Sequence, residues 1–294
     1  MQDFRMETFL TVCKFMNYTK AAQALNITQP AVSQHIRLIE DYYNVKLFYY
    51  EGKKLHLTEA GILLRDAATT MRHDEIILSE QLKTGGRLKF VFGATLTIGD
   101  FVLPEKLAYY IKKEQDAEVQ MLVDNTETLL KKINSGELDF AIIEGYFHKA
   151  EYDYKVHSRQ HYIAVCSGSH VFKQEPKVLS DLFGERIILR ESGSGTREIL
   201  ERHMEEKNYS IRDFRHIMEI GSISAIKSLV AADCGITFIY EAAVKQELKS
   251  CVLRKIPLTD LKIYNNFTMV WRKNSIFDNR YLKIFDELLC CTEN

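Results

Sequence analysis

Hydrogen-bonding side chains recur on one face of a helix predicted near the start of this 294-residue chain. Gln29, Ser33 and Arg37 are spaced four residues apart, with Gln34 beside them. Side chains at this spacing lie on the same face of a helix. Amide, hydroxyl and guanidinium groups form the hydrogen bonds that read base edges and contact phosphates in the major groove of DNA. A solvated face of a small helical bundle has a similar composition, so the surrounding elements must decide between the two.

The surrounding sequence predicts two helices joined by a short turn. Residues 3–16 carry apolar side chains at helical spacing, and a short helix capped by Thr19 is expected over residues 20–25. Thr28 is the N-cap candidate of the next helix, which runs to about Tyr43. The apolar residues that should face the core from this helix are Val32, Ile36 and Ile39. Two helices joined in this way form a helix-turn-helix pattern.

The next segment predicts a β-hairpin. Residues 45–48 and 55–58 have the pattern of two strands, and residues 49–54 form a turn between them. A hairpin that follows a helix-turn-helix forms a wing. Lys53 and Lys54 lie at its tip, where ammonium groups are placed to contact DNA phosphates.

In order and without gaps over residues 9–61, the sequence resembles the LysR-type transcriptional regulators. The matching residues are Phe9-Leu10, Ala21-Ala22, Ala24-Leu25, Thr28 to Ser33, Ile36, Ile39-Glu40, Leu47-Phe48 and Leu57 to Gly61. The resemblance implies a winged helix-turn-helix that reads double-stranded DNA at a dyad-symmetric promoter site. The expected DNA-binding residues are Lys20, Thr28, Gln29, Pro30, Ser33, Gln34, Arg37 and Lys53. Tyr50 stands where the family usually has an arginine, and His56 where a basic residue is common.

A long helix without proline is predicted from Glu59 to about Lys83. Its apolar residues fall on alternating four- and three-residue steps, the spacing of a coiled-coil seam, which Asp74 interrupts. The seam residues are Ala60, Leu64, Ala67, Met71 and Leu78. An amphipathic helix packed on its own domain has a similar pattern. The resemblance implies instead a linker helix that pairs two subunits into a homodimer, with a homotetramer as the larger assembly. Thr84-Gly85-Gly86 is expected to end the helix and form a hinge.

In the remaining two hundred or so residues, short apolar runs alternate with helical patterns, which indicates βαβ units and a mostly parallel sheet. The predicted strands are 88–93, 119–123, 140–143, 163–166, 187–189, 235–240 and 267–271. The predicted helices are 99–115, 127–135, 197–207, 223–232, 241–247 and 277–290. By resemblance, this segment is similar to a periplasmic binding protein, in which two crossing strands join two α/β lobes around a ligand cleft.

Three domains are therefore expected. Residues 1–58 form the winged helix-turn-helix, 59–87 the linker helix and hinge, and 88–294 an α/β two-lobed effector-binding domain. The first lobe is placed at about 88–162 plus 266–294, and the second at about 163–265.

Hydroxyl-rich segments lead into three of the predicted helices, at residues 94–99, 190–197 and 221–224, and the first two directly follow predicted strands. Ligands of open α/β sheets bind beyond the carboxyl ends of the strands, where helix N-termini present free N–H groups. The three segments are thus suited to converge on one carboxylate or oxyanion, and a small anionic effector is expected. The expected effector-binding residues are Thr95, Leu96, Thr97, Ser192, Ser194, Thr196 and Ser222. Serine and threonine are also the usual N-caps, which gives each segment a purely structural explanation.

Positive charge for an anionic ligand has two candidate sources. Arg190 and Arg197 both lie in the second hydroxyl-rich segment. Arg190 is followed directly by Glu191, so an internal ion pair is the other explanation for its presence.

Bulk properties restrict the class of protein further. The net charge of −1, from 39 Lys+Arg and 40 Asp+Glu, excludes a polybasic protein that coats nucleic acid by charge alone. The N-terminal sequence lacks a long apolar core, and no run approaches the roughly 18 apolar residues of a membrane span. A cytoplasmic protein without a membrane partner is expected. The six scattered cysteines are Cys13, Cys166, Cys234, Cys251, Cys290 and Cys291, and they form no paired metal motif.

The main hypothesis is a ligand-responsive, sequence-specific DNA-binding regulator. The alternative is a small-molecule-binding protein or an α/β enzyme with an accessory DNA-binding domain. The sequence has no GxSxG, HExxH or dinucleotide-binding glycine motif, so no enzymatic activity, cofactor or metal is expected.

Overall fold

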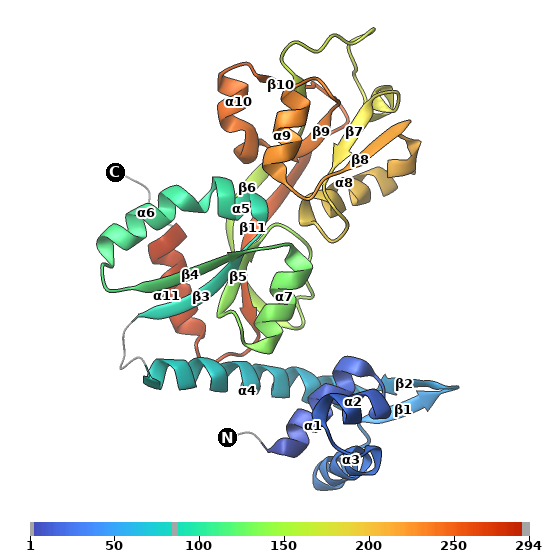
Figure 1. Cartoon of the computed structure of the whole chain (residues 1–294), viewed down its shortest axis with the longest axis vertical. Coiled ribbons are helices and arrows are strands. Elements are labelled where there is room, and N and C mark those ends of the chain that lie inside the picture. Colours follow the sequence, from blue (N-terminus) through green and yellow to red (C-terminus); the bar gives the residue numbers. More distant parts are fainter. Residues whose placement is uncertain (1–2, 84–87, 290–294) are drawn as a thin grey trace. The chain divides into compact units, whose positions relative to one another are not determined.

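The computed structural model describes residues 3–83 and 88–289 of the chain (Figure 1). The hinge expected at Thr84-Gly85-Gly86 lies outside the described residues, as do Cys290 and Cys291. The expected domain and lobe boundaries stay predictions.

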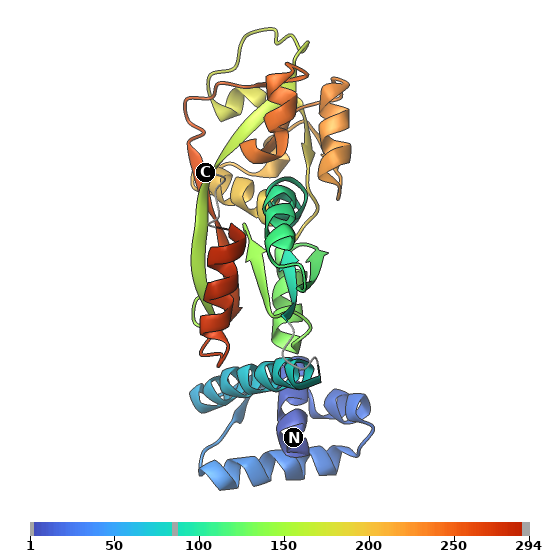
Figure 2. The same ribbon diagram turned by 90° about the vertical axis from the view of Figure 1, so that its left-hand side faces the viewer.

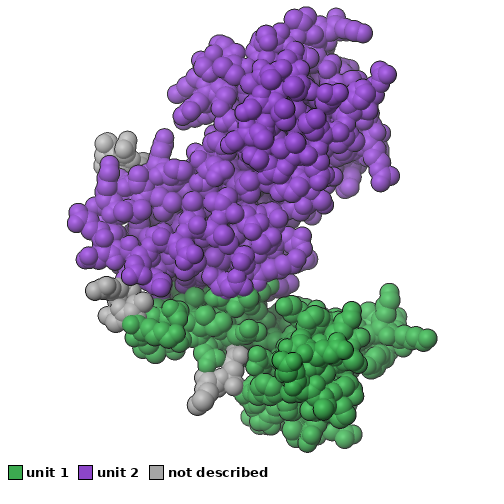
Figure 3. Space-filling model, viewed as in Figure 1, with its two compact units in different colours: residues 1–86, 134–136, 272–277 green, residues 87–133, 137–271, 278–294 purple. Residues whose placement is uncertain are grey.

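The chain divides into two compact units, which Figure 3 colours separately. The first comprises residues 1–86 together with two short segments, 134–136 and 272–277. The second comprises residues 87–133, 137–271 and 278–294.

The first unit begins with a three-helix bundle and a two-stranded wing, followed by a long helix. Its elements are α1 (Phe4–Phe15), α2 (Tyr18–Leu25), α3 (Gln29–Tyr43), β1 (Phe48–Glu51), β2 (Lys54–Leu57) and α4 (Glu59–Lys83). Helix α1 packs against α2, α3 and α4 (Figure 2). The predicted helix-turn-helix and linker helix are thus confirmed as secondary structure.

Side-chain caps begin the helices of the bundle. The Thr28 side chain accepts a hydrogen bond from the Ala31 N–H, which confirms it as the N-cap of α3. The expected cap of α2 is wrong: Asn17, not Thr19, accepts from the Lys20 N–H. Helix α2 therefore begins one residue before Thr19, because an asparagine carbonyl satisfies the free N–H groups at least as well as a threonine hydroxyl.

An apolar core holds the bundle and the wing together. Its buried residues are Phe9, Val12, Ala21, Ala22, Val32, Ile36, Ile39, Leu47, Phe48 and Leu55. The rings of Phe9 and Phe48 meet edge to face with centroids 5.6 Å apart, which attaches the first wing strand to α1. The predicted inward face of α3 is confirmed.

The wing is more compact than the sequence pattern predicted. Strands β1 and β2 pair from Phe48↔Leu57 to Glu51↔Lys54, so only Gly52 and Lys53 form the turn. Gly52 has a φ of +60°, as tight two-residue hairpin turns require. The predicted strand boundaries were wrong here because apolar patterning does not reveal cross-strand register.

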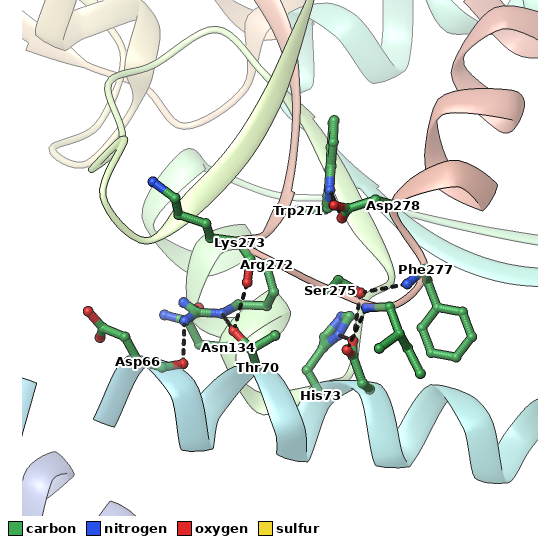
Figure 4. Close-up of polar contacts among 12 residues, drawn as sticks. Asp66, Thr70, His73, Asn134, Trp271, Arg272, Lys273, Ser275, Phe277 and Asp278 are labelled. Carbon is green, nitrogen blue, oxygen red and sulfur yellow. Dashed lines mark hydrogen bonds and ion pairs between the residues drawn. The ribbon is translucent and has the colours of Figure 1, made fainter. Parts of the chain in front are cut away.

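Helix α4 is fixed on one side by the segment 272–277 and by Asn134 (Figure 4). The Arg272 guanidinium, only 1% exposed, donates to Asn134 Oδ1 at 2.9 Å and to the Asp66 carbonyl at 3.1 Å. Its Nε donates to Thr70 Oγ1, and that hydroxyl donates to the Lys273 carbonyl. A buried guanidinium is tolerated only when its donors are satisfied in this way.

Asp74 forms the second attachment of α4. Its carboxylate accepts from Ser275 Oγ at 2.6 Å and from the Ile276 N–H at 2.9 Å, and the His73 ring lies 3.1 Å away. The side chain thus lies on the attached side of α4, together with the buried Thr70 and His73. Asp74, which interrupts the apolar spacing of the predicted seam, thus binds the segment 272–277.

The second unit is built on a seven-stranded sheet of order β10-β6-β11-β5-β3-β4, with β9 also paired to β6. The strands are β3 (Lys89–Ala94), β4 (Glu118–Val123), β5 (Phe140–Ile143), β6 (Tyr152–Ser167), β9 (Thr237–Tyr240), β10 (Leu253–Lys255) and β11 (Ile263–Arg272). Strand β3 runs parallel to β4 and β5, whereas β11 is antiparallel to β5, and β9 and β10 are antiparallel to β6. The sheet is mixed rather than mostly parallel.

Two further strands, β7 (Arg186–Leu189) and β8 (His216–Glu219), form a separate parallel pair. The helices are α5 (Leu96–Phe101), α6 (Leu103–Lys113), α7 (Thr126–Ser135), α8 (Gly195–Glu205), α9 (Ile223–Ala231), α10 (Lys245–Lys249) and α11 (Asp278–Leu289), with three short 3₁₀ turns. The expected helix over 99–115 is two helices, because Pro104 lies at the start of α6. Strands β8 and β10 were not predicted, since four and three residues carry too little periodicity.

Among residues 3–83 and 88–289, no helix has the length and apolar character that crossing a membrane requires. The same residues contain no group of three or more His, Cys, Asp or Glu side chains placed to hold a metal ion.

Replacing Asp74 by alanine should lower the free energy of unfolding by about 1–3 kcal/mol at neutral pH, because it leaves the Ser275 and Ile276 donors unsatisfied. Burial raises the pKa of Asp74, but hydrogen bonds from His73 and the 272–277 segment outweigh burial and hold the pKa below its usual value. The ionised carboxylate therefore stabilises the fold above its unfolded pKa of about 4. That contribution is lost as the pH falls through the lower folded pKa.

Urea denaturation at several pH values measures this difference. The gap between wild type and Asp74→Ala should shrink in acid, while the exposed control Asp41→Ala should show little loss at any pH. A loss of equal size in the control, or one independent of pH, would contradict the assignment.

Candidate DNA-reading face and effector-binding cluster

The start of α3 presents a polar face to solvent. Gln29, Gln34 and Arg37 are exposed, and Ser33 is half-buried. The Gln29 Nε2 donates to Ser33 Oγ at 2.9 Å, so the two side chains are held side by side one helical turn apart. This geometry places an amide and a hydroxyl together at the N-terminal end of the helix, the end from which recognition helices contact base edges.

A shallow polar depression extends this face toward the wing. It is lined by Tyr18, Gln29, Ser33, Ile36, Arg37, Glu40, Lys46 and Tyr50. Glu40 binds the loop before the wing, accepting from Lys46 Nζ at 2.5 Å and from the Leu47 N–H at 2.9 Å. Tyr50, 66% exposed on β1, thus lies at the edge of the face that contains Arg37. Sequence reasoning noted Tyr50 only as a departure from the family pattern.

The other expected DNA-binding residues lie at the margins of this face. Lys20 and Thr28 are exposed on α2 and at the start of α3, and Pro30 is exposed in the first turn of α3. Lys53 is exposed in the wing turn. The chain therefore presents one hydroxyl- and amide-bearing centre and a separate cation at the wing tip.

In the second unit, the side chain that gathers the expected effector-binding residues is Glu144, which sequence reasoning missed. It follows β5 directly and is 1% exposed. Thr196 Oγ1 donates to Glu144 Oε1 at 2.7 Å, and Thr97 Oγ1 donates to the same oxygen at 3.3 Å. Two of the three hydroxyl-rich segments thus converge on a carboxyl group of the chain itself. A glutamate at the end of a buried strand was the available signal in the sequence.

Close backbone contact brings the start of α8 to the end of β5. A Cβ on Gly195 would lie 3.0 Å from the backbone of Gly145, and a Cβ on Gly145 would lie 2.7 Å from Thr126 Oγ1. Only glycine allows two backbones to approach this closely. The packing also places Thr126, the first residue of α7, beside the cluster.

A second layer of polar groups orients this cluster. The Tyr162 hydroxyl lies 2.9 Å from the Thr196 carbonyl and 3.1 Å from the Phe238 carbonyl. The Asn265 amide donates to the Glu144 carbonyl and to the Tyr240 hydroxyl. Strands β6, β9 and β11 therefore all contribute to holding Glu144 and Thr196 in place.

Burial raises the pKa of Glu144 above its ordinary value, although the hydroxyls of Thr196 and Thr97 and the charge of Arg190 partly offset that shift. The Arg190 guanidinium, 5% exposed, donates through Nε and Nη2 to the two Glu191 oxygens at 2.7 Å each. Of the two explanations for Arg190, the internal ion pair is confirmed.

The remaining expected effector-binding residues occupy different environments. Thr95 and Ser194 are each 2% exposed, and neither caps its helix with a side-chain hydrogen bond. Leu96 is partly buried against an apolar cluster. Ser192 is exposed. Ser222 is exposed and accepts from the Ala225 N–H as the N-cap of α9, and no hydrogen bond in the described chain joins it to Glu144.

Comparison with known proteins shows similarity over nearly the whole chain. Residues 4–62 match the family described as bacterial regulatory helix-turn-helix protein, lysR family, and residues 83–288 match the LysR substrate binding domain. An uncharacterized HTH-type transcriptional regulator of Methanocaldococcus jannaschii is 26% identical over 268 residues, covering 90% of each chain. The HTH-type transcriptional regulator CysL of Bacillus subtilis is 28% identical over 274 residues, covering 90% of this chain and 87% of CysL.

Solved structures show the same fold. Full-length LysG from Corynebacterium glutamicum, with bound effector Arg, has a TM-score of 0.62 at 13% identity and covers 99% of this chain and 97% of LysG. The Synechocystis CcmR regulatory domain in complex with 2-PG has a TM-score of 0.62 at 20% identity, covering 70% of this chain and 98% of that domain.

The reading face predicts distinct effects for three alanine substitutions. Gln29→Ala and Ser33→Ala should weaken binding to the preferred DNA sequence by about 1–3 kcal/mol each and leave non-specific binding nearly unchanged, because they remove base contacts. Lys53→Ala should weaken specific and non-specific DNA binding alike, because it removes a phosphate contact. For the same reason it should reduce the slope of log affinity against log salt concentration by about 1. Fluorescence anisotropy on specific and scrambled duplexes at several salt concentrations measures both effects. Equal behaviour of all three variants would show that the faces are wrongly assigned.

Proposed function

The chain belongs to the LysR family of transcriptional regulators, and from this premise we propose how its residues read DNA, pair subunits and respond to a ligand. It is a DNA-binding, effector-responsive regulator. We propose that it has no enzymatic activity and that it acts in the cytoplasm, where the chromosomal DNA lies. The observation that carries the proposal is the exposed amide and hydroxyl face of α3 at a capped helix start, with a cationic wing turn beyond it.

In this proposal, the α3 face supplies sequence recognition and the wing supplies position. Gln29, Ser33 and Arg37 reach base edges or adjacent phosphates in the major groove, with Gln34 beside them. Lys20, Thr28, Pro30 and Lys53 contact the backbone or the groove walls. Tyr50 takes the place of the usual arginine, and its hydroxyl donates a neutral hydrogen bond to phosphate. Each reading head then releases few counterions, so affinity depends on several heads bound to one dyad-symmetric site.

The exposed side of α4 supports a homodimer. Large apolar side chains lie on it without cover from the described chain: Met71 is 68% exposed, Leu78 42% and Leu82 75%. An apolar hollow continues from this side to the bundle, lined by Met6, Tyr43, Val45, Leu47, Ala60, Leu63, Leu64, Ala67, Ala68 and Met71. Since Asp74 and Arg272 fix the other side of the helix, this side is the one that a second α4 can cover. A homotetramer is part of the proposal.

The ligand response is proposed to centre on the cluster around Glu144. The hydroxyls of Thr97 and Thr196 come from helices that follow different strands, and both donate to one carboxyl oxygen. A ligand that replaces or adds to these bonds changes the relative energies of alternative packings of β6 and β11, whose Tyr162 and Asn265 contact the same cluster. That shift alters the spacing of paired reading heads on DNA. The anionic effector expected from the sequence stays a prediction.

Selection of bound sequences from a random DNA pool tests the regulatory function directly. The full-length protein should enrich a dyad-symmetric sequence, and Gln29→Ala combined with Arg37→Ala should lose that enrichment while still melting cooperatively at a similar temperature. Enrichment of no sequence by the folded wild-type protein would contradict the proposal.

A charge on the exposed side of α4 tests the dimer. Met71→Glu should shift the protein toward monomer by at least tenfold in dissociation constant, because a desolvated carboxylate at an apolar interface costs several kcal/mol. Analytical ultracentrifugation measures the shift, and affinity for the dyad site should fall with it. Met71→Leu keeps the apolar surface and should remain dimeric. A monomeric wild type, or a dimer unaffected by Met71→Glu, would exclude this interface.

A further inference from the structure

Three buried polar atoms around the Glu144 cluster have no hydrogen-bond partner in the described part of the chain: Glu144 Oε2, Thr95 Oγ1 and Thr126 Oγ1. Their residues are 1%, 2% and 5% exposed. The Thr95 hydroxyl lies close enough to the Glu144 carboxyl to lower its pKa as a weak hydrogen-bond donor, but it does not reach the geometry of a full hydrogen bond. Thr126 lies beside Gly145. Buried polar atoms are almost always paired in native proteins, so these three point to a ligand that pairs with them.

The two bonds that Glu144 already makes define which group is missing. Its Oε1 accepts from both Thr97 and Thr196, whereas its Oε2 accepts from neither. When Glu144 is ionised, its unpaired oxygen is an acceptor only and needs a donor. The hydroxyl-rich segments that suggested an anion site in the sequence thus donate to a carboxyl group of the protein itself.

The positive charges near this cluster are already paired. Arg190 is bound to both oxygens of Glu191. Arg197 donates to Glu201 at 2.7 Å and also to Glu219. Two arginines therefore face three carboxylates before Glu144 is counted, and no unpaired guanidinium of this segment is left to bind an anionic ligand.

A second acidic group lies beside the same segment. A Cβ on Gly193 would lie 3.5 Å from Glu127 Oε2, so Glu127 borders the loop that leads into α8. Its partner is Lys131 on the same helix, at 2.5 Å. An anionic ligand at this cluster would meet the Glu144 carboxyl without an unpaired guanidinium to offset it, and a like charge within a few ångströms of an ionised buried carboxylate is strongly unfavourable.

We infer that the effector presents a positively charged hydrogen-bond donor, an ammonium or guanidinium group, to Glu144 Oε2. The Thr95 hydroxyl accepts from the same group, and Thr126 borders it on the α7 side. The inference rests on the proposed ligand response at this cluster and replaces the anionic effector that the sequence suggested. Glu144 is then the residue that determines the charge class of the ligand.

A cationic and an anionic ligand should have opposite effects on the protonation of Glu144 when they bind. A cation binds ionised Glu144, so binding releases a proton and affinity rises as the pH rises through the raised pKa of Glu144. An anion requires protonated Glu144, so binding takes up a proton and affinity falls as the pH rises. The other titratable and charged groups facing Glu144 are Arg190, which follows β7, Tyr162 of β6 and Tyr240 of β9. Burial raises the pKa of both tyrosines well above the ordinary value, so they stay neutral across the same range.

The test uses the full-length protein with four small probes: methylguanidinium, ethylammonium, acetate and sulfate. Thermal unfolding with 10 mM of each probe measures stabilisation, and calorimetry in two buffers of different ionisation enthalpy measures proton release. We expect one or both cations to stabilise the wild type with proton release, and neither anion to do so. Glu144→Gln should lower the affinity for the cation that binds by about tenfold or more, because a charge-assisted hydrogen bond is lost. The exposed control Glu105→Gln should bind as the wild type does.

A second variant guards against loss of fold. Thr95→Val removes the unpartnered hydroxyl and leaves both hydrogen bonds to Glu144 Oε1 intact. It should therefore lower the affinity for the cationic probe, and this result does not depend on whether Glu144→Gln folds. Stabilisation by acetate or sulfate with proton uptake would overturn the inference, and so would the absence of stabilisation by either cation. DNA affinity measured with the bound probe separates the two proposals. A probe that binds but leaves DNA affinity and footprint unchanged contradicts the ligand response itself, whichever charge it has.

Discussion

One buried guanidinium fixes the helix on which the first unit depends. Arg272 is 1% exposed and donates to α4, to Asn134 and to the Thr70 hydroxyl, so each of these groups is held where the donors reach it. Asp74 accepts from the same returning segment three residues further along. Polar contacts at two successive turns determine which side of α4 is covered. They therefore also determine that Met71, Leu78 and Leu82 remain exposed on the other side.

In the second unit, as in the first, a buried ionisable group must have its hydrogen bonds satisfied, but here the group is a carboxyl. The Glu144 carboxyl is buried at the end of β5, and hydroxyls from two different helices converge on one of its oxygens. A buried carboxyl must be hydrogen-bonded, so the helices can approach only in an arrangement that supplies those donors. The pairing is incomplete at the second oxygen. An incomplete polar cluster at a junction of several elements is sensitive to whatever completes it, which suits a site that must respond to a ligand.

The reading head was largely predictable from sequence because its determinants are local. The spacing of Val32, Ile36 and Ile39 predicted the buried face of α3, and Thr28 predicted where that helix begins. Errors arose where two local signals competed. Asn17 rather than Thr19 caps α2, and Pro104 divides the expected helix over 99–115. The wing turn was placed too broadly, since pairing register is a relation between strands rather than a property of either one.

By itself, the sequence determined most of the order of elements, the helix-turn-helix, the wing, the linker helix and the hydroxyl-rich segments after β3 and β7. Each of these follows from residues close together in the chain. Tertiary structure alone decided that Thr97 and Thr196 meet at Glu144, that Arg190 is committed to Glu191, and that Asp74 faces the 272–277 segment. Most of these contacts join residues far apart in the chain, and for the neighbours Arg190 and Glu191 the sequence left two explanations open. Periodicity and capping patterns carry no information about partners at such separations. The charge class of the ligand belongs to this second group, because it depends on which charged side chains the fold has already paired.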